Sequence, residues 1–263
     1  MQDQPIKSEE QWRLALTKGE NIPLHLHRIF GLLPANPRCK MCNAPFRGAG
    51  GLLMRVIGRR QSTKNPRYCE PCAFQEAGGA EVEISMLFAD IRGSTTLAES
   101  MSAGKFTKLI SRFYEVATDV LVRSDALIDR LVGDEVIGLF IPAFAGEEHS
   151  KRAIEAAQEL VRRLEKGDVE NMKLPVGVGV HTGIAYVGVV QGAEEGICDF
   201  TALGDNVNIT ARLASQAGAG EILVSDASYH AAGLVLDDLE ERNLMLKGKS
   251  ESIKVYVIKP QKE

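Results

Sequence analysis

Two aspartates in this chain stand where a hard metal ion would find oxygen ligands. Asp90 closes the apolar stretch Val82–Ala89, and Asp134 lies between two further short apolar stretches, in Gly133-Asp134-Glu135. Carboxylates at the ends of neighbouring strands are the ligands that Mg²⁺ prefers. Spacing alone leaves a second interpretation open, because an aspartate at a strand end is also a common helix cap or turn residue.

A second pair of polar residues lies on a predicted helix. Asn208 and Arg212 are four residues apart within Asp205–Gln216, whose pattern predicts a helix, so the two side chains share one helix face. The planar guanidinium group of an arginine matches the oxygens of a phosphate. A solvated helix face is the alternative for such a pair taken by itself.

Four cysteines form two Cys-x-x-Cys pairs in the first third of the chain. The spacing is C-x₂-C-x₂₆-C-x₂-C, and it comprises Cys39, Cys42, Cys69 and Cys72. Each pair brings two thiolates to one point, and four thiolates suit tetrahedral Zn²⁺. An iron–sulfur cluster uses the same four ligands, and two unrelated reduced pairs are a third alternative. Disulfides are not expected in a cytosolic chain.

The pattern of apolar residues predicts the elements that must position these side chains. From Glu81 onward strands and helices alternate, beginning with a strand over Val82–Ala89 and ending with one over Ile253–Ile258. Helices are predicted over residues 94–123 with a break near residue 103, over residues 149–166 and over residues 205–216. Two β-hairpins are predicted, one turning at residues 133–135 and one at His181-Thr182-Gly183. The polar stretch Ser8–Lys18 is compatible with a further helix.

Charge is unevenly distributed along the 263 residues. Residues 1–80 hold twelve Lys and Arg against six Asp and Glu, whereas residues 81–263 hold nineteen against twenty-nine. Together with the flexible Gly78-Gly79, this shift predicts two domains, residues 1–79 and residues 80–263. The composition, 44% hydrophobic and 25% charged, excludes intrinsic disorder and fibrous repeats. With no apolar signal segment at the start and no apolar run near the roughly 18 residues of a membrane helix, we expect a soluble, cytoplasmic protein.

Four motifs, taken in order, resemble the catalytic domain of class III nucleotidyl cyclases. They are the two strand-end aspartates Asp90 and Asp134, the segment Thr201-Ala-Leu-Gly-Asp-Asn-Val-Asn-Ile-Thr-Ala-Arg212, and Leu246-Lys-Gly-Lys249 before the last strand. The resemblance covers roughly residues 81–260. It implies an α+β fold with a ferredoxin-like βαββαβ core, preceded by the small cysteine-rich domain. The activity that it implies is an adenylate cyclase, which converts ATP to 3′,5′-cyclic AMP and pyrophosphate.

The resemblance also assigns roles to residues. In the family, aspartates matching Asp90 and Asp134, with the backbone carbonyl at Ile91, bind two Mg²⁺ or Mn²⁺ ions. The residue matching Asn208 orients the ribose, and the one matching Arg212 stabilises charge on the α-phosphate. Lys247 matches the lysine that holds the β- and γ-phosphates. Because the aspartates come from one subunit and the other groups from its partner, a homodimer with two equivalent sites is implied.

Arg130 and Thr201 match the positions that read the base. The family normally has lysine at the first position and Asp or Thr at the second when ATP is the substrate, so Arg130 departs from the pattern. Guanine would require an acceptor such as Glu, and strand alternation predicts that Asp129 points to the opposite face. Adenine is therefore favoured. The alternatives are a guanylate cyclase and a catalytically weak or inactive cyclase-like regulator that binds nucleotide.

The first domain is basic around its cysteines, with no acidic residue between Asn21 and Cys69. A basic metal knuckle can bind nucleic acid through phosphate contacts, but only Phe46 and Tyr68 offer aromatic stacking here. Nucleic acid is therefore not the expected partner. We expect instead that this metal-binding module regulates the cyclase or supports its dimer.

Overall fold

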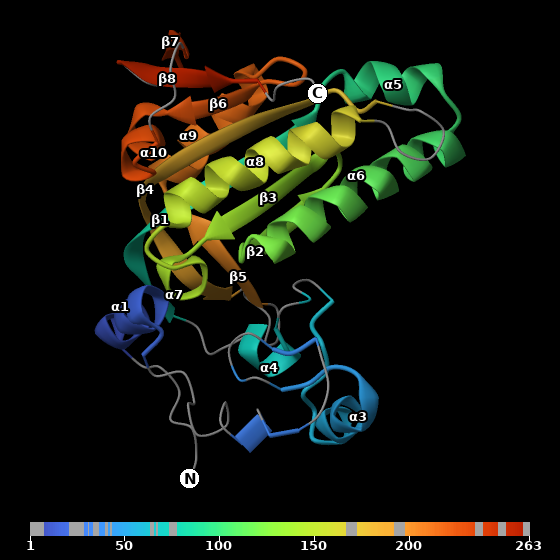
Figure 1. Ribbon diagram of the computed structural model, residues 1–263, viewed down its shortest axis with the longest axis vertical. Coiled ribbons are helices and arrows are strands. Elements are labelled where there is room, and N and C mark those ends of the chain that lie inside the picture. The colour runs from blue at the N-terminus through green and yellow to red at the C-terminus, as the bar shows by residue number, and fades with distance from the viewer. Residues whose placement is uncertain are drawn as a thin grey trace. The chain divides into compact units, whose positions relative to one another are not determined.

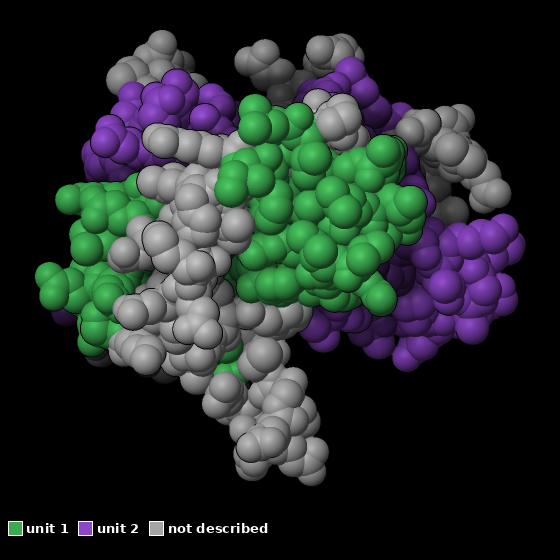
Figure 2. All heavy atoms as spheres, turned by 90° about the horizontal axis from the view of Figure 1, so that it is seen from below, with its two compact units in different colours: residues 1–82, 142–144, 186–203 green, residues 83–141, 145–185, 204–263 purple. Residues whose placement is uncertain are grey.

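A computed structural model shows how the chain folds (Figure 1). It describes residues 8–20, 29–30, 32–33, 37–39, 42, 44–63, 66, 68–73, 78–166, 173–191, 198–234, 239–246 and 251–259. The chain divides into two compact units, coloured in Figure 2. Unit 1 comprises residues 1–82, 142–144 and 186–203, and unit 2 comprises residues 83–141, 145–185 and 204–263. Over the described residues, no helix combines the length and the apolarity needed to span a bilayer.

Strands and helices alternate from residue 78 onward, as the sequence predicts. The earlier helices are α1 (Glu9–Lys18), α3 (Gly48–Val56) and α4 (Glu70–Ala73). The strands are β1 (Gly78–Ile91), β2 (Leu127–Val132), β3 (Glu135–Phe140), β4 (Val176–Gln191), β5 (Cys198–Leu203), β6 (Ile222–Ser225), β7 (Glu240–Met245) and β8 (Ser252–Ile258). The remaining helices are α5 (Ser94–Ser100), α6 (Ala103–Arg123), α7 (Pro142–Ala145), α8 (His149–Glu165), α9 (Asp205–Gln216) and α10 (Asp226–Ala231).

The described strands form one mixed sheet in the order β2-β3-β1-β4-β6-β8-β7, with β5 paired to β4. The antiparallel pairing of β1 with β3 runs from Ser85 opposite Phe140 to Asp90 opposite Glu135. The pairing of β4 with β6 is parallel. This α+β arrangement confirms the fold class predicted from the sequence.

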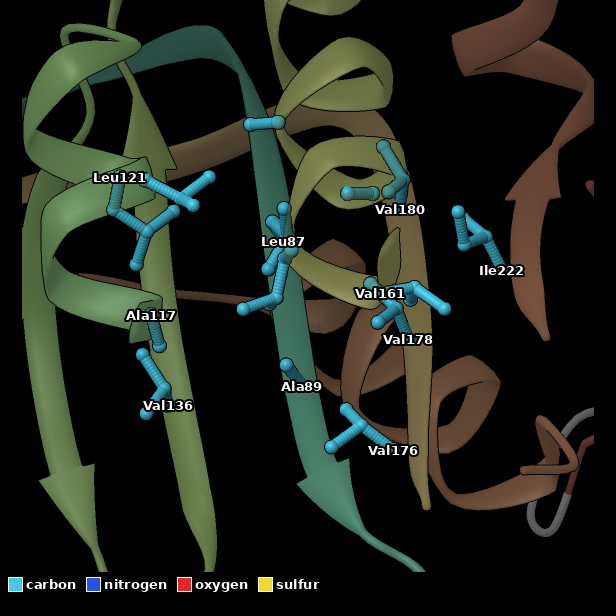
Figure 3. Packing of buried hydrophobic residues seen from close by; sticks show 14 of the residues in the cluster. Leu87, Ala89, Ala117, Leu121, Val136, Val161, Val176, Val178, Val180 and Ile222 are labelled. Atoms are coloured by element: carbon cyan, nitrogen blue, oxygen red, sulfur yellow. The ribbon is translucent and has the colours of Figure 1, made fainter. Parts of the chain in front are cut away.

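Helices α6 and α8 cover one face of the sheet in unit 2 (Figure 1). Side chains from alternate positions of the strands, such as Leu87 and Ala89 of β1 and Val176, Val178 and Val180 of β4, point toward these helices (Figure 3). Helix α6 begins at its N-cap Ser102, whose hydroxyl accepts a hydrogen bond from the backbone N–H of Lys105. It then presents buried residues three or four apart, which is the spacing of an amphipathic helix.

Helix α9 packs on the opposite side of the strands. Ile209 and Leu213 of α9 are buried in a second apolar cluster with Leu223 of β6 and Val255 of β8. The helix also lies very close to β4, because a Cβ atom added to Gly179 would overlap the backbone of Ala214. Only glycine at this position of the strand allows that approach.

One prediction from the sequence is wrong. Residues 174–190 were expected to form a hairpin turning at His181-Thr182-Gly183, but β4 is a single strand, and its hairpin partner is β5. The side chains of His181 and Thr182 are buried and hydrogen-bonded within unit 2, so these polar residues belong to a strand and not to a solvated turn.

Unit 1 contains α1, the cysteine pairs and the β4–β5 hairpin. Ser8 and Gln11 form a capping box at the start of α1, and Gly19 ends the helix in the left-handed conformation. Trp12 of α1 lies 6.5 Å, between ring centroids, from Phe200 of β5. Aromatic contacts of this kind stabilise the packing of a small apolar cluster.

The ion pair between Glu221 and Arg242 offers a test of this fold. Both oxygens of Glu221 accept hydrogen bonds from Arg242, at 2.9 and 3.0 Å, and one also accepts from the N–H of Gly218. The Arg242 guanidinium chiefly lowers the pKa of Glu221 to about 2, although burial opposes this. A lowered pKa means that the stabilisation is present above the ordinary glutamate pKa near 4.5 and is lost as the pH falls toward 2.

We predict that Glu221→Gln lowers the free energy of unfolding by about 1–3 kcal/mol at pH 7, and by progressively less between pH 4.5 and 2. Urea unfolding at several pH values measures this. Glu241→Gln is the matched control, since Glu241 is 56% exposed in its pair with Lys254, and its loss should cost less than about 0.5 kcal/mol. Equal effects of the two substitutions at pH 7 would contradict the stabilising role given to the Glu221–Arg242 ion pair.

Candidate functional site

The sheet brings Asp90 and Asp134 together. Asp90 lies at the end of β1, and Asp134 lies in the tight β2–β3 turn, where Gly133 has a φ of 60°. The backbone N–H of Ile91 donates to the carbonyl of Asp134 at 3.1 Å, which fixes the turn against the strand end. Tyr114 of α6 supports the same turn, because its hydroxyl donates to the carbonyl of Gly133 at 2.8 Å.

The environment of Asp90 favours a cation. The pKa of Asp90 is raised to about 6, chiefly by burial; Arg92 opposes this increase, and the nearby Asp134 carboxylate contributes to it. The pKa of Glu135, which pairs with Asp90 across the strands, is also raised by burial and by the two aspartates. Within the described part of the chain, the buried Oδ1 of Asp90 has no hydrogen-bond partner. A divalent cation would satisfy that oxygen and relieve the carboxylate repulsion, so these residues fit the metal expected here.

Arg92 is a residue of this site that the sequence reasoning missed. Its guanidinium forms an ion pair with the Asp90 carboxylate and donates to the carbonyl of Ser215 of α9 at 2.9 Å. The backbone N–H of Arg92 donates to the carbonyl of Pro175 at 2.6 Å. Arg92 lies in the turn that follows β1, and its partner on α9 is a backbone carbonyl, so no sequence pattern indicated this role.

Asn208 and Arg212 lie one turn apart on α9, as the sequence predicts. Asn208 is exposed and Arg212 is half-buried, whereas their neighbours Ile209 and Leu213 are buried against the sheet. Among the described residues, the guanidinium of Arg212 takes part in no ion pair. The two polar side chains are therefore presented on the surface of α9, where they are available to a ligand.

The base-reading candidates lie on different strands. Arg130 is on β2 and Thr201 is on β5, where Thr201 pairs with Gly188 and is almost fully buried. The register of β2 shifts between Ile128 and Arg130, so Asp129 sits at a bulge. Its carboxylate lies 3.5 Å from Nε of Arg130, although the Asp129 side chain is buried and the Arg130 side chain is exposed. Lys247 lies outside the residues that the structure describes.

The four cysteines in unit 1 converge. Their sulfur atoms all lie within 4.8 Å of one another, and the Sγ atoms of Cys42 and Cys69 are 3.6 Å apart. Three of the four are buried, and Cys72 is partly exposed. The backbone N–H of Cys69 donates to Sγ of Cys39 at 3.3 Å, which is the kind of contact that stabilises a thiolate.

The thiols of this cluster share their protons unevenly. Hydrogen bonds from neighbouring thiols lower the pKa of Cys39 and of Cys69, whereas hydrogen bonds to the other three raise the pKa of Cys72. Arg59 lies beside the cluster, with Nη1 3.8 Å from the sulfur atoms of Cys69 and Cys72. A converged set of thiolates with a neighbouring cation is a group that could hold a metal ion.

Comparison with known proteins identifies the family. Residues 79–260 match the family described as "Adenylate and Guanylate cyclase catalytic domain". This match covers more than half of the chain, and the chain therefore belongs to the class III cyclase family. It confirms the resemblance on which the expectations about the fold rest.

Named relatives include cyclases of both kinds. The chain is 32% identical over 136 residues to "Adenylate cyclase 1" of Rhizobium meliloti (strain 1021), a match covering 50% of this chain and 20% of that protein. The chain thus spans about a fifth of the length of that relative. Among solved structures, the guanylyl cyclase Cya2 has a TM-score of 0.62 at 24% identity, over 68% of this chain and 93% of that one. The adenylyl cyclase CyaB from P. aeruginosa has a TM-score of 0.60 at 25% identity, over 70% and 97% of the two chains.

The metal fit of the aspartate pair predicts a change in stability that can be measured without any turnover. Mn²⁺ at one hundred times its dissociation constant should stabilise the wild-type protein by about 2.7 kcal/mol. Asp90→Asn should abolish this gain. In EDTA, the variant should be at least as stable as the wild type, because it removes a desolvated charge beside Asp134. Differential scanning fluorimetry measures both effects.

The control is Asp119→Asn on α6, which removes a carboxylate paired with Arg123 and Arg163. This variant should keep the full response to Mn²⁺. A Mn²⁺ response that survives in Asp90→Asn would show that the metal binds elsewhere.

Proposed function

We propose that this protein is an adenylate cyclase, which converts ATP to 3′,5′-cyclic AMP and pyrophosphate. The observation that carries the proposal is the pair of converging carboxylates, Asp90 and Asp134, in a chain of the class III cyclase family. The similar proteins include both adenylate and guanylate cyclases, so they support a cyclase that acts on ATP or on GTP. The choice of ATP rests on Thr201 and Arg130.

Asp90, Asp134 and the carbonyl of Ile91 would hold the divalent metals. When bound, Mg²⁺ or Mn²⁺ supplies two effects, a lower pKa for the ribose 3′-hydroxyl and neutralisation of the triphosphate. Asn208 orients the ribose so that this hydroxyl lies in line with the α-phosphorus. Arg212 stabilises the charge that grows on the α-phosphate oxygens as pyrophosphate leaves. Positioning and charge stabilisation are sufficient here, and no covalent nucleophile from the protein is required.

The active site is assembled between two copies of the chain. Asn208 and Arg212 lie on the outer surface of α9, which supports their use by a partner's metal site. In the resulting homodimer, each site takes its aspartates from one protomer and its Asn and Arg from the other. Lys247 of that second protomer would hold the β- and γ-phosphates.

The purine is read by Thr201 and Arg130. The hydroxyl of Thr201 accepts from the N6 amine of adenine, and the guanidinium of Arg130 donates to N1. The Asp129 carboxylate lies 3.5 Å from Nε of Arg130, which supports a role in aligning the guanidinium. A guanylate cyclase is the second candidate, since the guanylyl cyclase Cya2 shares the fold.

Residues 1–79 form a regulatory module around one zinc ion. Four thiolates around a tetrahedral ion with Zn–S bonds of about 2.3 Å are separated by about 3.8 Å. The sulfur atoms here lie within 4.8 Å of one another, which supports a single ion. An iron–sulfur cluster distributes its thiolates over separate iron atoms and needs a wider set.

Complementation between two inactive variants tests the shared site. Asp134→Ala removes a metal ligand and Arg212→Ala removes a transition-state contact, so each should lose at least about a hundredfold in kcat. Mixed under conditions of subunit exchange, the two variants should regain up to about a quarter of the wild-type activity, because half of the dimers are mixed and each has one intact site. Heterodimers confirmed by differential tagging that show no cyclase activity would contradict the shared site.

Metal analysis tests the regulatory module. Protein purified without oxygen should be colourless and contain one zinc per chain, and Cys42→Ser should lose that zinc while the aspartate site still responds to Mn²⁺. Mass spectrometry of the metal content and a visible spectrum measure this. If the protein instead contains iron and acid-labile sulfide and absorbs visible light, the four cysteines hold an iron–sulfur cluster and the zinc assignment is wrong.

A further inference from the structure

A chain of buried hydrogen bonds crosses the core of unit 2 and ends at α9. Its members are polar side chains from α8, β1, β4, β6, α10 and α9, namely His149, Ser150, Ser85, Thr182, Ser228, Ser225, His181 and Asn206. Most of them are less than 8% exposed. Buried polar groups of this kind cost free energy unless they are paired, so a connected network fixes the positions of its members.

Asn206 is the member that reaches the active-site helix. It is the second residue of α9, two positions before Asn208. Its Nδ2 donates to the carbonyl of Ile184 at 2.8 Å, so its Oδ1 is the acceptor for Nε2 of His181 at 2.9 Å. Both partners belong to β4, and one amide side chain therefore ties the start of α9 to that strand at two points.

The hydrogen bonds of Asn206 fix the tautomer of His181. Nε2 carries the proton that is donated to Asn206, and Nδ1 lies 2.7 Å from the hydroxyl oxygen of Ser225. The His181 ring is thus held on both sides and cannot turn without breaking a buried hydrogen bond.

Gly183 makes room for this contact. A Cβ atom added to Gly183 would lie 2.6 Å from Cγ of Asn206, closer than side-chain atoms pack. The glycine that interrupts the apolar pattern of β4 is therefore the place where the Asn206 amide rests on the strand.

Within the described part of the chain, the N-cap residue of α9 makes no side-chain hydrogen bond to the first turn. That residue is Gly204, whose positive φ of 138° favours glycine, and glycine has no side chain with which to cap the helix. Helices are usually fixed at this end by a Ser, Thr, Asp or Asn cap. The two hydrogen bonds of Asn206 to β4 therefore help to set the entry angle of α9.

We propose that Asn206, His181 and Gly183 form a latch that positions Asn208 and Arg212 for catalysis. The latch rests on the proposed function, because Asn208 and Arg212 act on the nucleotide only if the protein is a cyclase. The proposed function assigns none of the three latch residues a contact with the substrate. Their role is to set the rotation of α9 and its distance from the sheet. This position matters for the rate, because a displacement of about 1 Å at a reacting group can lower the rate a hundredfold.

The latch predicts a distinctive kinetic result. Asn206→Ala should lower kcat about 10- to 100-fold and change KM for ATP by less than about threefold, because Arg212 contributes mainly in the transition state. Gly183→Ala should cause a similar loss by displacing the Asn206 side chain. In the double variant the loss should be no greater than in Asn206→Ala, since the added methyl group then has nothing to displace. Losses that multiply in the double variant would overturn the latch.

Ser150→Ala is the matched control. Ser150 belongs to the same network and is more deeply buried than Asn206, but it bonds to Ser85 and Thr182, far along the network from α9. This variant should lower the melting temperature without changing kcat at a temperature where it is fully folded. A loss of kcat equal to that of Asn206→Ala would mean that the network is merely structural.

Hydrogen exchange separates the latch from the proposed function. Backbone amides of residues 206–212 should exchange faster in Asn206→Ala and in Gly183→Ala than in the wild type or in Ser150→Ala. If the wild type makes no cyclic nucleotide and this exchange pattern is found, the latch stands and the proposed function fails. If exchange in α9 is unchanged in both variants, the latch is wrong whatever the activity.

Discussion

The pairing of β1 with β3 is the constraint from which the active site follows. It places Asp90 opposite Glu135 and beside the Asp134 turn, in surroundings that raise the pKa of two of these carboxylates. A fold gains no stability from such an arrangement, since each charge is desolvated and repelled by its neighbours. The Arg92 guanidinium offsets only part of this cost, and a divalent cation would relieve the rest, which supports the metal-dependent reaction that we propose for this edge of the sheet.

Helix α9 is the second part of the site, and β4 controls where it lies. The glycines of that strand allow the helix backbone to approach closely, and a buried polar network ends on its first turn. At its other end, Arg92 connects the carbonyl of Ser215 with the Asp90 carboxylate. The helix that presents Asn208 and Arg212 is thus held at both ends, and one of these contacts reaches the proposed metal ligand Asp90 of the same chain.

Much of this arrangement could be predicted from the sequence. The periodicity of residues 149–166 and 205–216 predicted α8 and α9, because both helices bury one apolar stripe. The aspartate pair and the cysteine spacing were also visible, since each depends on short motifs. The second hairpin was predicted wrongly, because His181-Thr182-Gly183 reads as a polar turn until the buried partners from β6 and α9 are known. Arg92 and Asn206 were missed for the same reason, as their partners Ser215 and Ile184 are backbone carbonyls that carry no pattern in the sequence.

The most direct test of the central claim is product formation from ATP and from GTP, with Mn²⁺ or Mg²⁺, resolved by chromatography. The account predicts cyclic AMP from ATP, much less cyclic GMP from GTP, and loss of the product in Asp90→Ala. Cyclic GMP as the main product would make the protein a guanylate cyclase and overturn the roles of Thr201 and Arg130. If protein whose four-cysteine site holds its metal makes no cyclic product from either nucleotide, the proposed cyclase activity is wrong. A catalytically inactive regulator that binds nucleotide would then be the better account.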